Sequence, residues 1–268
     1  MNSPEGNAGL LVVTFVVAFG LCLWVRRLLG EREVHNNSWA STLSYIATAY
    51  GVVVGFSILF LFGEFSDARQ SVGAEATSIG TAYNQAELFP DTQPGVQRAL
   101  ICYARSVPAH DWPALAEHTG GSPQVDAAYL ALVVSLGEAD QPAAGALHAA
   151  SATNLAAQIG NISTARETRL VAAETTMPPM LWVLLIGGGA FVVMLIFAVT
   201  LPSRRGTQAL LVSMSSVFTM VLLLIVASLA NPFAAGSGGV TPRLIEETAV
   251  SMSESAPPSI SAPCSIDR

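Results

Sequence analysis

The sequence contains no lysine and few charged residues of any kind. Charged side chains make up 12% of its 268 residues, and all twelve basic residues are arginine. Soluble domains carry about 25% charged residues, so the chain is depleted about twofold. The net charge of −7 also excludes a nucleic-acid-binding protein, because such proteins need clustered basic side chains to displace counterions. The composition therefore predicts that the protein's partner is a lipid bilayer and that it does not bind nucleic acid.

Motifs of catalysis and of metal binding are missing as well. The four histidines are far apart, and no HExxH pattern or nucleophile–base arrangement occurs. Cys22, Cys102 and Cys264 form no CxxC pair, so we expect buried thiols without a disulfide framework or a zinc site. The glycines at 187–189 lie inside an apolar run, which excludes a phosphate cradle and favours close helix packing. The sequence therefore predicts a non-enzymatic protein without a cofactor.

Four apolar runs without a charged residue are long enough to cross a membrane. A spanning helix needs roughly 20 apolar residues to cross about 30 Å of hydrocarbon. The runs are Ala8–Val25, Leu43–Phe62, Pro179–Thr200 and Ala209–Ala230. They predict an all-α integral membrane protein with four transmembrane helices in two hairpins and a helical soluble insertion between helices two and three.

The chain divides accordingly into four parts. Residues 1–63 are expected to form the first transmembrane hairpin, and residues 179–230 the second. Between them, residues 64–178 read as a helical, water-facing insertion, because apolar residues recur there every three or four positions. No breaker separates this insertion from the second membrane helix, so we expect one long helix across the boundary, and a loop later at Pro108. Serine and proline enrichment predicts a flexible tail at residues 231–268.

Five arginines occupy the two short connections within the hairpins, whereas the N-terminal tail contains none. Because arginine and lysine accumulate in cytoplasmic loops, both connections are expected in the cytoplasm. The N-terminus, the insertion and the C-terminus of this multi-pass cell-membrane protein are then extracytoplasmic. The topology determinants are Arg26, Arg27, Arg204 and Arg205.

The second apolar run carries two neighbouring stripes at helical spacing. One consists of small or hydroxyl residues, and within it Gly51 and Gly55 match the pattern that lets membrane helices approach closely. The other is apolar and aromatic. In an oligomer, one stripe would pack while the other narrows a pore, since apolar rings gate by dewetting. Ordinary packing within one chain predicts the same small residues and is the preferred interpretation at this point. The candidate pore or helix-packing residues are Ser44, Thr48, Gly51, Val52, Gly55, Phe56 and Phe60.

Short blocks of residues follow one another in a fixed order along nearly the whole chain. They are Trp24–Glu33, Tyr50–Phe56, Phe65–Arg69, Glu75–Ala76, Ala165–Leu170, Pro179–Trp182 and Asn231–Phe233. This series resembles the bestrophin-like family of bacterial membrane proteins, long filed as a domain of unknown function. The resemblance implies four membrane helices with a helical insertion, and the family name implies kinship with bestrophins, which are pentameric anion channels. Bestrophins keep the insertion in the cytoplasm, whereas the arginines here predict the opposite orientation.

Two functions fit these observations. The first is an oligomeric ion channel built around the second membrane helix, with the lipid bilayer and further copies of the chain as partners. The alternative is an envelope sensor or scaffold whose insertion binds a partner. The membrane runs contain no charged residue, which argues against active transport, because intramembrane charges mark pumps and proton relays.

Overall fold

In the computed structural model, the chain folds into two helical units. The membrane unit comprises Met1–Gly63 and Thr176–Asn231 with the short piece Ala235–Gly238, and the insertion unit comprises the rest of the chain. The residues that the structure describes are 4–29, 37–90, 93–117, 119–137, 146–174, 177–234, 238–261 and 264.

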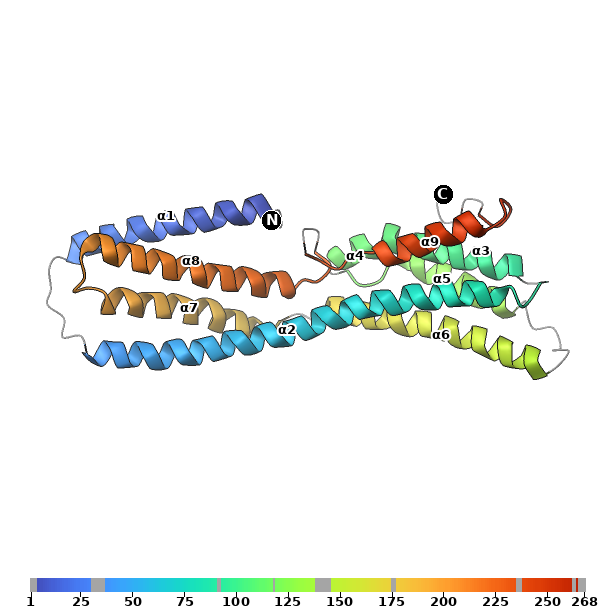
Figure 1. Cartoon of the computed structure of the whole chain (residues 1–268), viewed down its shortest axis with the longest axis horizontal. Helices are drawn as coiled ribbons and strands as arrows, with labels where there is room; N and C mark the ends of the chain where they lie inside the picture. The colour runs from blue at the N-terminus through green and yellow to red at the C-terminus, as the bar shows by residue number, and fades with distance from the viewer. Residues whose placement is uncertain are drawn as a thin grey trace. The chain divides into compact units, whose positions relative to one another are not determined.

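The membrane unit consists of four helices long and apolar enough to cross a membrane, as the sequence predicts. In Figure 1, α8 and α7 lie between α1 and the first part of α2. The α1–α8 contact is built around the buried residues Cys22, Ala209 and Val212, and a second cluster joins α2, α7 and α8. The helices are α1 (Pro4–Leu29), α2 (Asn37–Ala86), α7 (Pro179–Val199) and α8 (Arg205–Leu229).

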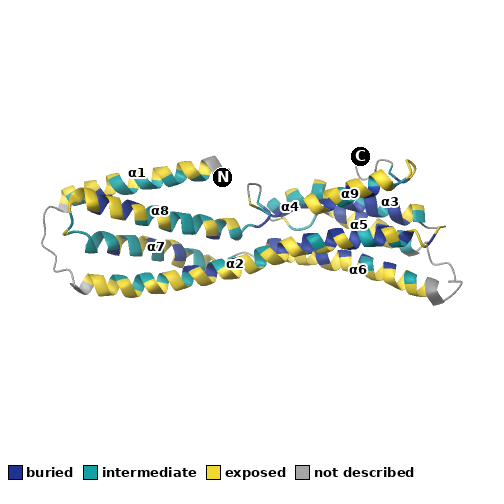
Figure 2. Ribbon diagram, viewed as in Figure 1, coloured by how far each residue is buried: buried dark blue, intermediate teal, exposed yellow. Residues whose placement is uncertain are grey.

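The insertion unit packs helices around one apolar core. Figure 2 shows that buried residues are concentrated here and are sparse in the membrane unit, as expected where lipid rather than protein covers an apolar surface. The second part of α2 contributes one side of this core, so the expected long helix across the boundary is confirmed. The other elements are α3 (Gln93–Ser106), the π-helical turn η1 (Val107–Asp111), α4 (Trp112–Ala116), α5 (Pro123–Gly137), α6 (Ala146–Glu174) and α9 (Arg243–Ser255).

The C-terminal segment differs from the flexible tail expected at 231–268. Helix α9 buries Ile245, Ala249 and Met252 against the core, and the Tyr83 hydroxyl donates a hydrogen bond to the Met252 carbonyl oxygen at 3.2 Å. The three buried residues recur at spacings of four and three, so they form one face of a helix. The serine-rich composition of the tail conceals this periodicity.

A disulfide bond joins Cys102 of α3 to Cys264, with their Cα atoms 5.6 Å apart. The expectation of buried thiols is therefore wrong for these two cysteines. Their separation of 162 residues hides the pairing, because spacing rules detect only neighbouring cysteines. Cys22 is free and buried, as predicted.

Candidate functional site

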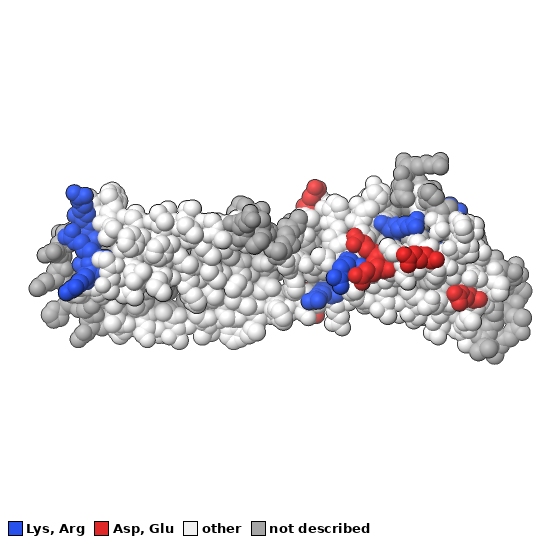
Figure 3. Space-filling view, turned by 45° about the horizontal axis from the view of Figure 1, so that its top comes forward, with Lys and Arg blue, Asp and Glu red and all other residues white. Residues whose placement is uncertain are grey.

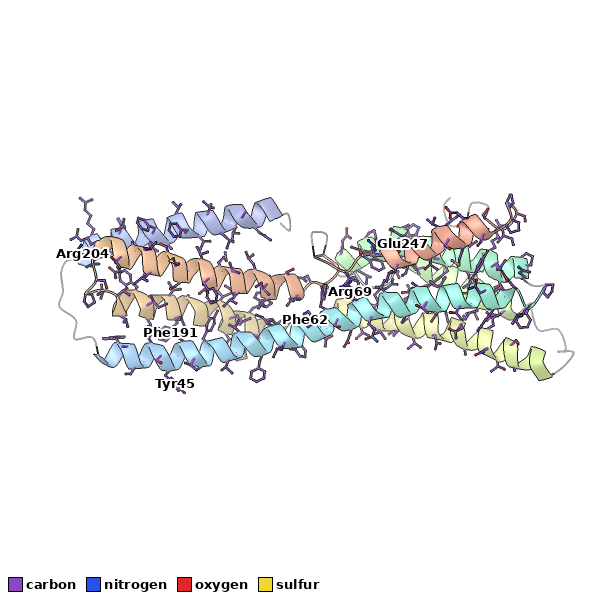
Figure 4. All side chains as sticks on the ribbon, in the orientation of Figure 1. Tyr45, Phe62, Arg69, Phe191, Arg204 and Glu247 are labelled. Atoms are coloured by element: carbon purple, nitrogen blue, oxygen red, sulfur yellow. A yellow bond between two sulfur atoms is a disulfide. The ribbon has the colours of Figure 1, made fainter. Side chains whose placement is uncertain are left out.

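The outward face of α2 in the membrane unit carries the residues predicted to pack or to line a pore. Tyr45 is 77% exposed and Phe56 69% exposed, and Figure 4 shows Tyr45 pointing away from the other membrane helices. A Cβ atom added at Gly51 or Gly55 would meet nothing within 4 Å among the described residues. Within the described part of one chain, no other helix packs closely against Gly51 or Gly55. The predicted residues of this face, all exposed, are Ser44, Thr48, Gly51, Val52, Gly55, Phe56 and Phe60.

The opposite face of α2 packs against α7. The Tyr50 hydroxyl donates a hydrogen bond to the Leu185 carbonyl oxygen at 3.0 Å. A Cβ atom at Gly188 would lie 2.8 Å from Cδ2 of the Tyr50 ring, and one at Gly189 would lie 2.8 Å from the Tyr50 hydroxyl oxygen. The close packing predicted for the glycine run is confirmed at these two positions, whereas Gly187 faces open space. The sequence contained the glycines but gave no sign that Tyr50 was their partner.

The arginines assigned to topology lie at one end of the membrane unit. Arg26 is half-buried, and its guanidinium donates hydrogen bonds to the Gln208 side-chain oxygen and, at 3.1 Å, to the Leu201 carbonyl oxygen. These bonds tie the last turn of α1 to the turn before α8 and to the first turn of α8. Arg27 and Arg204 are exposed.

A buried ionic network occupies the centre of the insertion unit and was missed by sequence reasoning. Arg169 of α6 is fully buried between two carboxylates: its Nη2 lies 2.7 Å from Asp111 Oδ2 and its Nη1 lies 3.2 Å from Glu75 Oε2. The Tyr103 hydroxyl donates to Glu75 Oε1 at 2.7 Å. The Arg169 guanidinium also lies 4.9 Å from the centre of the Trp112 ring. Residues of α2, η1 and α4 thus contact this arginine of α6.

Asp111 is the second shared group of this network. It accepts hydrogen bonds from Arg169 and Arg166 and, at 2.8 Å, from the Ser122 backbone N–H. Arg166 in turn reaches Asp126 at 2.6 Å, at the exposed edge of the network. The network therefore contains three carboxylates and two guanidinium groups.

The π-helical turn η1 determines where Asp111 lies. The loop expected at Pro108 is absent: the chain continues from α3 through η1 directly into α4. Pro108 lies inside this continuous helical stretch, where proline removes one i→i−4 hydrogen bond of the helix. A π turn widens the helix by one residue, and such turns occur frequently at functional sites. Here it ends on Asp111, which faces α6.

Burial controls the electrostatics of this network. Burial raises the pKa of the Glu75 carboxyl, and the neighbouring Arg169 opposes this rise. Burial and the proximity of Glu75 raise the pKa of the Tyr103 hydroxyl well above its ordinary value. Among the described residues, no group of three or more His, Cys, Asp or Glu could hold a metal ion. The arrangement suits a proton-dependent structural contact that joins α2 to α3 and α6.

Comparisons with known proteins agree with this architecture. The sequence pattern of the bestrophin-like domain matches residues 12–243. No curated protein matches the chain. A crystal structure of a bacterial bestrophin homologue from Klebsiella pneumoniae has 12% sequence identity and a TM-score of 0.69, covering 94% of this chain and 99% of that one. A single-substitution variant of that homologue gives 10% identity and a TM-score of 0.74, covering 92% and 97%.

A further crystal structure, described as a membrane protein with one substitution, has 10% identity and a TM-score of 0.75, with coverage of 91% and 97%. At these identities the structural likeness concerns the fold alone. The family match, in contrast, extends over most of the sequence. The chain belongs to the bestrophin-like family.

Proposed function

We propose that the protein is an oligomeric ion channel of the cell membrane whose pore is lined by α2. The observation that carries this proposal is the outward face of α2, which the described part of the chain leaves uncovered and where glycine and hydroxyl residues stand beside exposed aromatic rings. Membership of a family of the channel type, whose name implies kinship with the bestrophin anion channels, supports it.

The composition of this face differs from that of a face that contacts lipid alone. The large exposed side chains in the middle of α1 are aliphatic, as suits lipid contact: Val12, Val13, Val16, Val17 and Leu21. The α2 face instead includes Ser44, Thr48, Gly51 and Gly55. Small residues let helix backbones approach closely, and this packing is a main source of helix association in lipid. We infer that this stripe contacts a second copy of the chain.

The adjacent stripe would then face the axis of the assembly. Val52, Phe56 and Phe60 are exposed and spaced by four residues along α2. Rings of such residues form a hydrophobic constriction, which closes a pore by excluding water. A polar side chain in the ring should hydrate the constriction and raise conductance.

The test combines particle mass with current. The wild-type protein is purified in detergent, its mass is measured by multi-angle light scattering, and it is then reconstituted into a planar bilayer. We expect an oligomer that conducts ions and a higher single-channel conductance for Phe56→Ser. Val12→Ser is the matched control, because Val12 is equally exposed on α1 and should leave conductance unchanged. A monomer, or no current from wild type and Phe56→Ser alike, would rule out the channel.

We further propose that the insertion unit lies outside the cytoplasm. Two independent features support this orientation. Arginines are concentrated in the short connections at the opposite end of the membrane helices. The disulfide between Cys102 and Cys264 belongs to the insertion unit, and disulfides persist in oxidising compartments and are rare in the cytoplasm.

Cysteine labelling in intact cells tests the orientation. Ser163→Cys lies on the exposed surface of α6, and Thr207→Cys lies on the exposed first turn of α8. In a Cys22→Ala background with the disulfide intact, an impermeant maleimide should label Ser163→Cys in intact cells and Thr207→Cys only after lysis. The reverse pattern would place the insertion in the cytoplasm, as in bestrophins.

One observation favours the alternative of an envelope sensor or scaffold. Helix α5 is mostly apolar beyond its first turn, and Leu130 and Val134 are exposed. An apolar face on a water-facing helix marks a contact surface. If Leu130→Ser with Val134→Ser abolishes cross-linking to another envelope protein and the wild type carries no current, this function replaces the channel.

A further inference from the structure

The arginines at the end of the membrane unit gather into one patch. Arg26 and Arg27 lie in the last turn of α1, Arg204 precedes α8 and Arg205 is its first residue. The hydrogen bonds from Arg26 to Leu201 and Gln208 bring these segments together. Figure 3 shows the basic side chains side by side at this end. We name these four residues the arginine patch.

The patch lies at the boundary of the apolar surface. The apolar span of α1 ends at Leu28, and that of α8 begins at Arg205. Leu28 is 67% exposed and Trp24 60% exposed on the same turns. Tryptophan prefers the membrane–water interface, so the guanidinium groups are at the depth of lipid headgroups.

Neither Arg27 nor Arg204 has an acidic partner among the described residues. The only acidic residue in the described part of the membrane unit is Glu5, at the other end of α1. Three of the four arginines are exposed. The first turn of α8 adds backbone N–H groups without a side-chain cap, and this end of a helix carries partial positive charge. Such an accumulation of positive charge at headgroup depth attracts anionic lipid.

The arginines of the patch do not all play the same part. Arg26 donates to two acceptors of its own chain. Arg27 and Arg204 are exposed, and their guanidinium groups have no hydrogen bond or ion pair with another described residue. The guanidinium group of arginine forms bidentate hydrogen bonds with two oxygen atoms of a phosphate. Arg26 therefore holds two segments of the protein together, whereas Arg27 and Arg204 are left to contact a ligand.

We propose that Arg27 and Arg204 bind the phosphate of an anionic phospholipid headgroup in the adjacent leaflet. The partner is a lipid rather than a free anion, because its acyl chains continue along the apolar surface at Leu28. This inference does not depend on whether the protein conducts ions.

Thermal melting of the full chain in detergent micelles tests the proposal. Phosphatidylglycerol should raise the melting temperature of the wild type by several degrees, and phosphatidylcholine at the same mole fraction should not. The double variant Arg27→Gln with Arg204→Gln should lose more than half of this rise while melting at the wild-type temperature in detergent alone. Native mass spectrometry should show the same loss of bound phosphatidylglycerol.

Two further variants and one free anion complete the design. Arg69→Gln with Arg98→Gln removes the same charge from exposed positions of the insertion unit and should keep the full rise. Arg26→Gln should lower the melting temperature without lipid, because two acceptors lose their donor. The proposal is overturned if the Arg27 and Arg204 variant keeps the lipid-induced rise, if the control loses it equally, or if inorganic phosphate produces the same rise.

Discussion

The Asp111 carboxylate accepts hydrogen bonds from several donors at the centre of the insertion unit. Two guanidinium groups and one backbone N–H converge on it, and its side chain is fully buried. Breaking a buried ion pair from one side leaves an uncompensated charge away from water, which is far more costly than losing an exposed pair. Burial of a carboxylate, rather than its charge alone, therefore determines how much it contributes to the stability of this unit.

Two isosteric substitutions compare these positions directly. Asp111→Asn should lower the free energy of unfolding by about 3–5 kcal/mol. Asp126→Asn removes the exposed partner of the same Arg166 and should cost under about 1 kcal/mol. Denaturant titration of the full chain in micelles measures both. Equal losses would show that Asp111 is not the centre of the network.

Glu75 makes the stability of the insertion unit depend on pH. Because burial raises its pKa in the folded chain, the folded state binds a proton more readily than the unfolded state does. Its contribution to stability is therefore fully present below the ordinary glutamate value of 4.5 and is lost as pH rises through the raised value. The groups facing it are Tyr103, Arg169, Asp111 and Arg166.

Glu75→Gln imitates the protonated side chain and should remove this dependence. The melting temperature of the wild type minus that of the variant should fall as pH rises from about 4.5. Glu167→Gln, which removes an exposed carboxylate of α6 outside the network, provides the control. A flat difference for Glu75→Gln would mean that Glu75 does not titrate in this range.

Helix α2 has one face packed against α7 and one face exposed in the single chain, and substitutions at glycines distinguish them. Gly188→Leu would push the Tyr50 ring away, so thermal stability should fall while the particle mass stays the same. Gly187→Leu, one residue earlier but facing open space, is the control and should leave stability within the experimental error. Gly51→Leu should leave the single chain folded and reduce the particle mass. Loss of stability in Gly51→Leu at constant mass would contradict the assembly role of that stripe.

The elements that sequence reasoning located are those with a local signal. An apolar run of spanning length is local, and so is the uninterrupted helical pattern that continues α2 beyond Phe62. The ionic network has no such signal, since Glu75, Asp111 and Arg169 are far apart in sequence and each resembles an ordinary surface charge. The same holds for α9, whose three buried residues are hidden in a serine-rich segment, and for the Tyr50 contact with α7.

At the scale of the whole molecule, the disulfide fixes the C-terminal segment to α3. Removing a native disulfide typically costs 2–5 kcal/mol, although this chain has two units and need not unfold in one step. We therefore expect Cys102→Ser with Cys264→Ser to act locally, with faster amide hydrogen exchange in α9 and little change in α7 and α8. Uniformly faster exchange in both units would contradict this. Cys22→Ala is the control, because that thiol is unpaired.

The chain between Cys102 and Cys264 contains both helices of the second membrane hairpin, so the bond closes a covalent ring that passes twice through the bilayer. During biosynthesis such a ring can close only after α7 and α8 have both been inserted and the end of the chain has reached the side of the membrane where α3 lies. A closed ring is thus a chemical record of completed insertion. It also means that one proteolytic cut between the two cysteines would leave the two fragments joined until a reductant is added.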